Sequence, residues 1–159
     1  MIRNPHHLIA ALGLGLLAAL AHSQAHAQAQ AQASPAGLWK TIDDETKKEK
    51  SLIRITEAGG VFSGKLEKLL DPATPADAVC EKCSDERKGK PLVGMTLVKG
   101  VRHSDGDKAM WDGGEILDPN NGKTYKVRMT PAEGGKTLAV RGYIGAPLLG
   151  RTQTWFRVE

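Results

Sequence analysis

Eight short segments of strand-forming sequence follow one another between residues 36 and 158, and most are separated by residues that favour tight reversals. Gly59-Gly60, Asp105-Gly106, Gly134-Gly135 and the run 118–122 contain residues that accept positive φ angles. No stretch of ten or more residues here shows a convincing helical period, which argues against crossover helices and a parallel sheet. The predicted strands are 37–42, 51–56, 61–68, 95–101, 108–117, 124–129, 137–143 and 151–158.

The segment 124–130 alternates most regularly, with apolar or aromatic residues from Tyr125 to Met129 at odd positions and polar residues from Lys126 to Thr130 at even positions. This pattern is typical of a strand that is wet on one face. Eight such strands can hide their edges by closing into an antiparallel barrel that has room for one small ligand. A sandwich is the alternative. Gly113-Gly114 predicts a bulge or bend inside one strand.

The first part of the chain has the features of an export signal. Arg3 precedes an apolar stretch, 8–21, that is too short to span a bilayer but is typical of a signal-peptide core. Ala25-His26-Ala27 predicts cleavage after Ala27, with 21–23 as a weaker rival and an uncleaved anchor as the alternative. We therefore expect a signal peptide at 1–27, a low-complexity tether at 28–35 and one domain at 36–158.

Export predicts a periplasmic or secreted protein. The chain holds 22 basic and 18 acidic residues, so loss of Arg3 leaves a net charge of +3. Because the protein is expected to be exported, we expect no nucleic-acid partner, and the interspersed signs indicate a solvated surface. We also expect no stable membrane insertion, and a monomer. Lipid attachment at the cleavage point would need a Cys there, and the first Cys is Cys80.

The segment 71–91 breaks the strand pattern and holds both cysteines, Cys80 and Cys83. At this spacing in an oxidising compartment we expect a disulfide. A redox-active pair is expected at a helix start after a strand, and Ser84 stands where haem attachment needs a His. The sequence leaves open whether the segment is a functional flap or an excursion pinned by its disulfide.

Catalytic and metal sites find little support. His103 is the one imidazole after the predicted cleavage point, and it lies in an expected turn without a nucleophile elbow. Two Cys and one His do not complete a structural zinc site. The acidic run 43–45 is followed by two lysines, as in a solvated turn. We expect no catalytic residues, metal or cofactor.

The last two strands supply the ligand-binding candidates. Arg141, Tyr143, Gln153 and Trp155 fall on alternating positions that would share one face. If that face is inside, Arg141 needs Glu115, Asp112 or an anionic ligand as partner. If it is outside, Leu138, Val140 and Ile144 fill the core, and we favour this alternative slightly because apolar residues normally take the interior.

Five motifs occur in order along the predicted domain: GMTL at 94–97, WDGGEILDP at 111–119, GKTY at 122–125, VRGY at 140–143 and GRTQTW at 150–155. Together they resemble the exported bacterial family called domain of unknown function 2147, with a match from Gly37 to Arg157. The family has no established activity. The resemblance implies a lipocalin-like (calycin-type) barrel that opens with Gly37-x-Trp39. It further implies a late-strand arginine covering Trp39, which is Arg157 or, less well, Arg151.

The expected function is non-catalytic binding of a small apolar or amphipathic ligand. If the barrel has a usable cavity, Arg141 is expected to pair with a carboxylate or phosphate head, while Val127, Met129 and Trp111 contact an apolar body. The alternative is an envelope interaction or scaffold protein that acts through its loops. A hydrolase or redox enzyme is the third hypothesis, and no paired nucleophile and base supports it.

Overall fold

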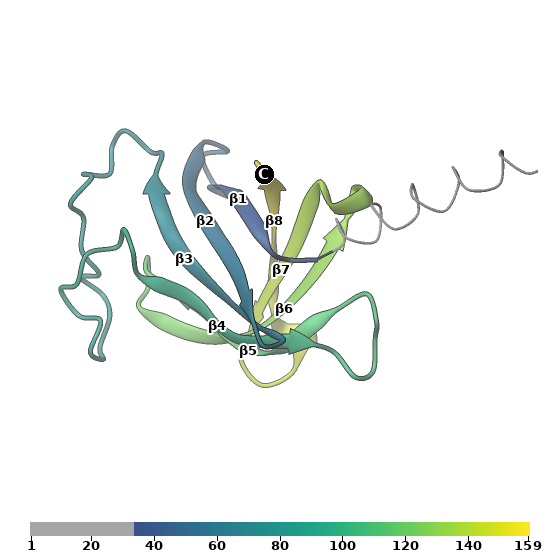
Figure 1. Ribbon diagram of the computed structural model, residues 1–159. Coiled ribbons are helices and arrows are strands. Elements are labelled where there is room, and N and C mark those ends of the chain that lie inside the picture. The colour runs from purple at the N-terminus through teal and green to yellow at the C-terminus, as the bar shows by residue number, and fades with distance from the viewer. Residues whose placement is uncertain (1–33) are drawn as a thin grey trace, which may run out of the picture. The chain divides into compact units, whose positions relative to one another are not determined.

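The computed structural model describes residues 34–159, in which eight antiparallel strands pair in chain order and close into a barrel (Figure 1). The predicted all-β barrel is confirmed and the sandwich is excluded. Two predicted strands match in full, and the others differ by one to three residues at one or both ends. The elements are β1 (Gly37–Ile42), β2 (Glu49–Ala58), β3 (Val61–Leu69), β4 (Thr96–His103), β5 (Trp111–Asp118), β6 (Lys123–Ala132), η1 (Glu133–Gly135), β7 (Thr137–Tyr143), η2 (Pro147–Leu149) and β8 (Arg151–Arg157).

Strand alternation sorts the side chains between the interior and the solvent. In β6, Val127 and Met129 are fully buried, whereas Lys126, which precedes them, is exposed and Arg128 between them is half-buried. Burial of such apolar side chains on the inner face is the main favourable contribution to folding. The predicted signal peptide at 1–27, and the tether up to residue 33, lie outside the described residues. Within 34–159 there is no helix whose length and apolar character would let it cross a membrane.

The barrel closes where the first and last strands meet. β1 pairs with β8 through only two residue pairs, Trp39 with Arg157 and Lys40 with Phe156. Two backbone hydrogen bonds extend the closure, because Leu38 N donates to Glu159 O at 2.9 Å and Val158 N donates to Leu38 O at 2.8 Å. Pairing of these strands leaves the sheet without a free edge.

Strand β5 is irregular where it pairs with β6. Gly113 has a φ of +75°, and the pairing of β5 with β6 shifts register between Trp111 and Gly114. The bulge predicted at Gly113-Gly114 is therefore confirmed. A bulge increases local twist and curvature, which barrel closure requires.

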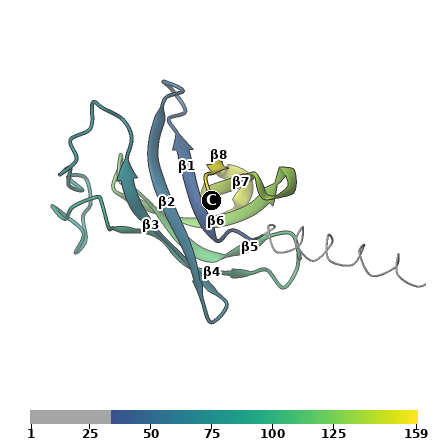
Figure 2. The same ribbon diagram turned by 45° about the horizontal axis from the view of Figure 1, so that its top comes forward.

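The two ends of the barrel differ. At the closed end, defined by Trp39 and Arg157, the connections are the short turn at 59–60, the β4–β5 loop and η1. At the open end lie the connections 43–48, 70–95, 119–122 and 144–150. Both views show the long β3–β4 connection on the opposite side from the β4–β5 loop (Figure 1 and Figure 2). The open end is where the interior becomes accessible.

Candidate functional site

A cavity of about 830 Å³ occupies the open end of the barrel. Its volume lies within the range of about 300 to 1,000 Å³ that is usual for small-molecule pockets. The inner wall is apolar because inward positions of five strands carry aliphatic or aromatic side chains. These are Ile53 on β2, Leu66 on β3, Leu97 on β4, Val140 on β7 and Trp155 on β8.

Two buried polar side chains that line the cavity form hydrogen bonds with each other. Thr41 and Ser51 are directly paired on β1 and β2, and each is only 6% exposed. Their hydroxyl oxygens lie 2.7 Å apart, and the Thr41 hydroxyl also donates to Ser51 O at 3.4 Å. A buried hydroxyl without a partner is costly, so this pairing lets the inner wall stay dry.

At the rim of the cavity, hydrogen bonds and an ion pair link side chains of β8 to Asp44. The indole Nε1 of Trp155 donates to Gln153 Oε1 at 3.5 Å, and Gln153 Nε2 donates to Asp44 Oδ2 at 2.8 Å. Arg151 forms an ion pair with the same Asp44 carboxylate. Asp44 belongs to the β1–β2 connection, so these contacts join that connection to β8, the neighbour of β1 in the barrel.

Two other rim carboxylates are held by their own turns. Thr46 donates to Asp43 through its backbone N–H and its hydroxyl, and these bonds hold the pKa of Asp43 well below its usual range, with a further contribution from Lys50 at 3.3 Å. Asp118 accepts hydrogen bonds from Asn120 N and from the side-chain amides of Asn120 and Asn121. Both carboxylates therefore serve turn geometry.

The prediction that Arg141, Tyr143, Gln153 and Trp155 share one face is wrong. The register pairs Arg141 with Thr152 and Val140 with Gln153. Residues directly opposite each other point to the same side of a sheet. Gln153 and Trp155 therefore face inward with Leu138 and Val140, whereas Arg141 and Tyr143 belong to the outer face. Tyr143 also borders the cavity, because it lies at the end of its strand.

Arg141 does not line the cavity, so the prediction that it anchors a ligand head there is not met. Its guanidinium donates to Pro147 O at 2.7 Å, to Leu148 O at 3.1 Å and to Thr152 Oγ1 at 2.7 Å. These bonds fix the β7–β8 connection to the outer wall. That connection exposes three apolar side chains, Ile144 at 63%, Leu148 at 86% and Leu149 at 81%.

Trp111 also lies away from the cavity. Its ring packs edge-on against Phe62, with centroids 6.3 Å apart, and against His103 at 4.9 Å. Val127 and Met129, the other residues expected to meet an apolar ligand body, belong to the filled core and do not line the cavity. The expected contact of these three residues with a ligand is therefore wrong, because the closed end is packed by its own side chains. Leu138 and Val140 fill the barrel core as expected, but Ile144, which was expected to join them, is exposed.

At the closed end, Trp39 is fully buried under an arginine. The Arg157 guanidinium carbon lies 4.1 Å from the Trp39 ring centroid, whereas Arg151 lies at the open end. Arg157 also donates to Gly135 O at 2.5 Å, Ala36 O at 2.8 Å and Ser34 O at 2.8 Å, and burial lowers its pKa. Its Nη1 occupies the space that a Cβ on residue 37 would need, so the guanidinium packs directly against Gly37.

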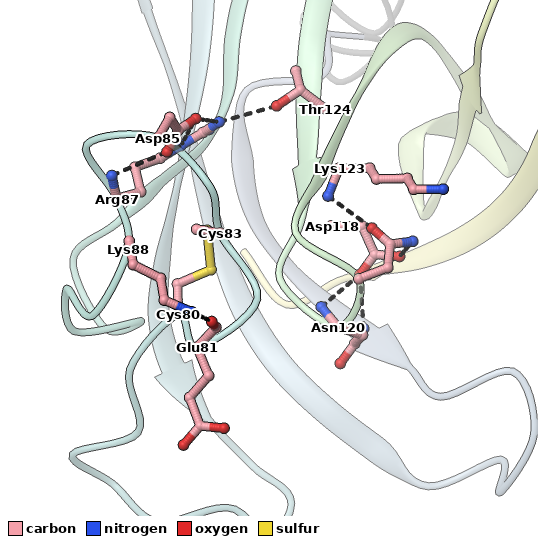
Figure 3. Close-up of a disulfide and its surroundings, with 11 residues drawn as sticks. Cys80, Glu81, Cys83, Asp85, Arg87, Lys88, Asp118, Asn120, Lys123 and Thr124 are labelled. Carbon is pink, nitrogen blue, oxygen red and sulfur yellow. Dashed lines mark hydrogen bonds and ion pairs between the residues drawn. A yellow bond between two sulfur atoms is a disulfide. The ribbon is translucent and has the colours of Figure 1, made fainter.

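Cys80 and Cys83 form the predicted disulfide, and both are buried. Figure 3 shows this disulfide facing the β5–β6 turn, with Arg87 bridging to Thr124. Arg87 Nη2 donates to Thr124 Oγ1 at 3.0 Å, and Lys82 O lies where a side chain on residue 122 would begin.

The same segment is closed at its base by backbone contacts. Val79 pairs with Pro91, and Leu92 N donates to Ala78 O at 2.9 Å. The segment is thus pinned by its disulfide, by its own backbone and by the β5–β6 turn. Its flanking residues also reach the mouth, because Thr74 and Leu92 line the cavity.

His103, the last residue of β4, is held by the loop that follows it. Its Nε2 lies 2.8 Å from Lys108 O, and the ring packs against Trp111. Among residues 34–159, no group of three or more His, Cys, Asp or Glu side chains is arranged to hold a metal ion. The cavity is thus the strongest candidate for a functional site.

A closed eight-stranded antiparallel barrel, with a cavity at its open end and Arg157 over Trp39 at its closed end, has a lipocalin-like fold. The chain belongs to the bacterial family described as "Uncharacterized protein conserved in bacteria (DUF2147)", whose model matches residues 37–157. The family resemblance noted in the sequence is therefore confirmed.

Among solved structures, the barrel is similar to one described as "Protein HP1028 from the human pathogen Helicobacter pylori belongs to the lipocalin family". The TM-score is 0.67 at 20% sequence identity, over 79% of this chain and 84% of that chain. Similarity at this level of identity shows the fold alone. None of the curated proteins matches this chain.

Proposed function

We propose that this protein is an exported, non-catalytic carrier or binder of a small apolar or amphipathic ligand. The observation that supports the proposal most directly is the cavity of about 830 Å³, with its apolar wall from Ile53 to Trp155 and its polar rim. Eight-stranded barrels of this size enclose one small ligand, and pockets that combine apolar walls with a few polar groups are typical binding sites.

Export rests on the apolar stretch at 8–21 and the Ala25-His26-Ala27 site. The presence of a buried disulfide agrees with an oxidising compartment. We expect the mature protein to begin at Gln28, as measured by N-terminal sequencing of protein recovered from a Gram-negative periplasm. Recovery of a species that retains residues 8–21 would instead indicate a tethered protein.

The binding function is tested by filling the cavity. Gly142 lines the cavity, and a Cβ placed on it would meet Tyr125 at 3.5 Å and Ile116 at 3.7 Å, which are ordinary contact distances. Gly142→Phe should therefore occupy the cavity without forcing the strands apart. We expect it to raise the Kd of the apolar fluorescent probe N-phenyl-1-naphthylamine at least tenfold, or about 1.4 kcal/mol.

Thr154→Phe is the matched control, because Thr154 is exposed on the outer face of β8. It introduces the same aromatic ring outside the barrel, so the probe affinity should match that of the wild type. Thermal unfolding of both variants verifies that the barrel is intact. Equal probe binding by Gly142→Phe and the wild type would contradict binding inside the barrel.

The β7–β8 connection favours one alternative, an envelope interaction protein that acts through its loops. Ile144, Leu148 and Leu149 place exposed apolar surface beside the mouth, and clustered apolar side chains of this kind mark interaction sites. Failure of the wild-type protein to bind the apolar probe would favour this alternative over the carrier function.

A further inference from the structure

The cavity separates an apolar interior from a charged rim, so it can orient a ligand. Ile53, Leu66 and Val140 form part of the inner wall, whereas the charged residues all come from the rim or its connections. A ligand with an apolar body would lose binding energy if its charged head were buried against that wall. The head must therefore lie at the rim.

The rim carries more negative than positive charge. Four carboxylates line it, Asp43, Asp44, Glu45 and Asp118, against two cations, Lys50 and Arg151, which leaves a formal charge of −2. This sign is opposite to that of the whole chain, whose formal net charge is +4. The net positive charge of the whole chain would thus attract anions, whereas the net negative charge of the rim attracts cations.

Asp44 is the carboxylate best placed to meet a ligand head. It accepts a hydrogen bond from Gln153 on the neighbouring strand at 2.8 Å, and its ion pair with Arg151 is solvent-accessible, since the Arg151 side chain is 66% exposed. Exposed ion pairs contribute little stability. A cationic group delivered by a ligand can therefore replace Arg151 at Asp44 with little loss.

We propose that the cavity selects amphipathic ligands with a cationic head, which binds Asp44 in exchange for Arg151 while the apolar body fills the barrel. This inference rests on the proposed binding function and specifies its ligand class. The apolar cavity provides the binding site, and the carboxylates decide the charge of the head. Arg151 acts in the empty protein as an internal substitute for that head.

The test compares two ligands with the same twelve-carbon chain, dodecylammonium and dodecanoate, as competitors of N-phenyl-1-naphthylamine below their micelle concentrations. At low ionic strength we expect dodecylammonium to bind about tenfold more tightly, equivalent to about 1.4 kcal/mol. The preference should shrink in about 0.5 M salt, because the rim charges are exposed to solvent.

Two rim variants assign the preference to Asp44. Asp44→Asn should reduce the preference to about threefold or less, and Arg151→Ala should weaken dodecanoate binding without weakening dodecylammonium binding. Glu57→Gln is the matched control, since it removes the same charge from an exposed position at the closed end of β2 and should leave the preference unchanged.

The outcomes separate this inference from the proposed function. Binding of dodecanoate as tightly as dodecylammonium, or an unchanged preference in Asp44→Asn, would overturn the cationic selectivity while the carrier function stands. Absence of binding by the probe and by both twelve-carbon ligands would overturn the carrier function itself.

Discussion

Replacing Trp39 with alanine should lower the free energy of unfolding by about 3 to 5 kcal/mol, the usual range for emptying a buried large aromatic site. Trp39 is fully buried, its Nε1 donates to Pro35 O at 2.8 Å, and its ring lies under the Arg157 guanidinium. The substitution removes the indole packing, the hydrogen bond and the cation–π contact together. It also falls at the pairing that closes the barrel.

The measurement is urea unfolding followed by circular dichroism, with a fall in Tm on the order of 10 °C or more expected in thermal melts. Phe156→Ala is the control, because Phe156 is an aromatic residue on the same strand as Arg157 but is 42% exposed. Its cost should be clearly smaller. Equal destabilisation by the two substitutions would show that burial of Trp39 under Arg157 adds nothing to the free energy of unfolding.

Gly114→Ala should destabilise the barrel by about 1 to 3 kcal/mol, the usual cost of overpacking, and the local geometry favours the upper end. A Cβ on Gly114 would lie 2.5 Å from Lys99 O and 2.6 Å from Val101 N. Both are backbone atoms of β4, so no change of rotamer relieves the clash. The two strands must therefore separate at this position.

Gly106→Ala is the control for this prediction. Gly106 lies in the β4–β5 loop, and a Cβ placed on it meets no atom within 4 Å. We expect that substitution to be neutral or slightly stabilising in the same denaturant titration, because it only restricts the unfolded chain. A similar loss of stability in both variants would mean that the close approach of β4 and β5 is not the cause.

The architecture could be predicted because its signals are local. Turn residues such as Asp105-Gly106 mark the reversals, and alternation such as that around Val127 marks the strands. The disulfide followed from the short spacing of Cys80 and Cys83, and the position of Arg157 over Trp39 followed from family resemblance. Each of these features is fixed by nearby residues or by a recognisable motif.

The side on which the last two strands display their residues could not be predicted. Even-numbered Val140 pairs with odd-numbered Gln153, so odd-numbered Arg141 and Gln153 lie on opposite faces. A shift of one residue in the register would have put them together. That register depends on the geometry of the 144–150 connection, and no local pattern indicates it. Sequence reasoning also missed Asp44, which is 109 positions away from its partner Gln153.

Closure through two residue pairs between the first and last strands has a kinetic consequence. The hairpins from β1 to β8 form from contacts close in sequence, but Trp39 meets Arg157 only after the whole domain has been arranged. Contacts with such large sequence separation slow folding, because the loop-closure entropy is lost before the contact forms. We therefore expect β1–β8 pairing to be the last step of folding. Until then both strands present unpaired edges, and the nearly complete sheet is the species most prone to aggregate.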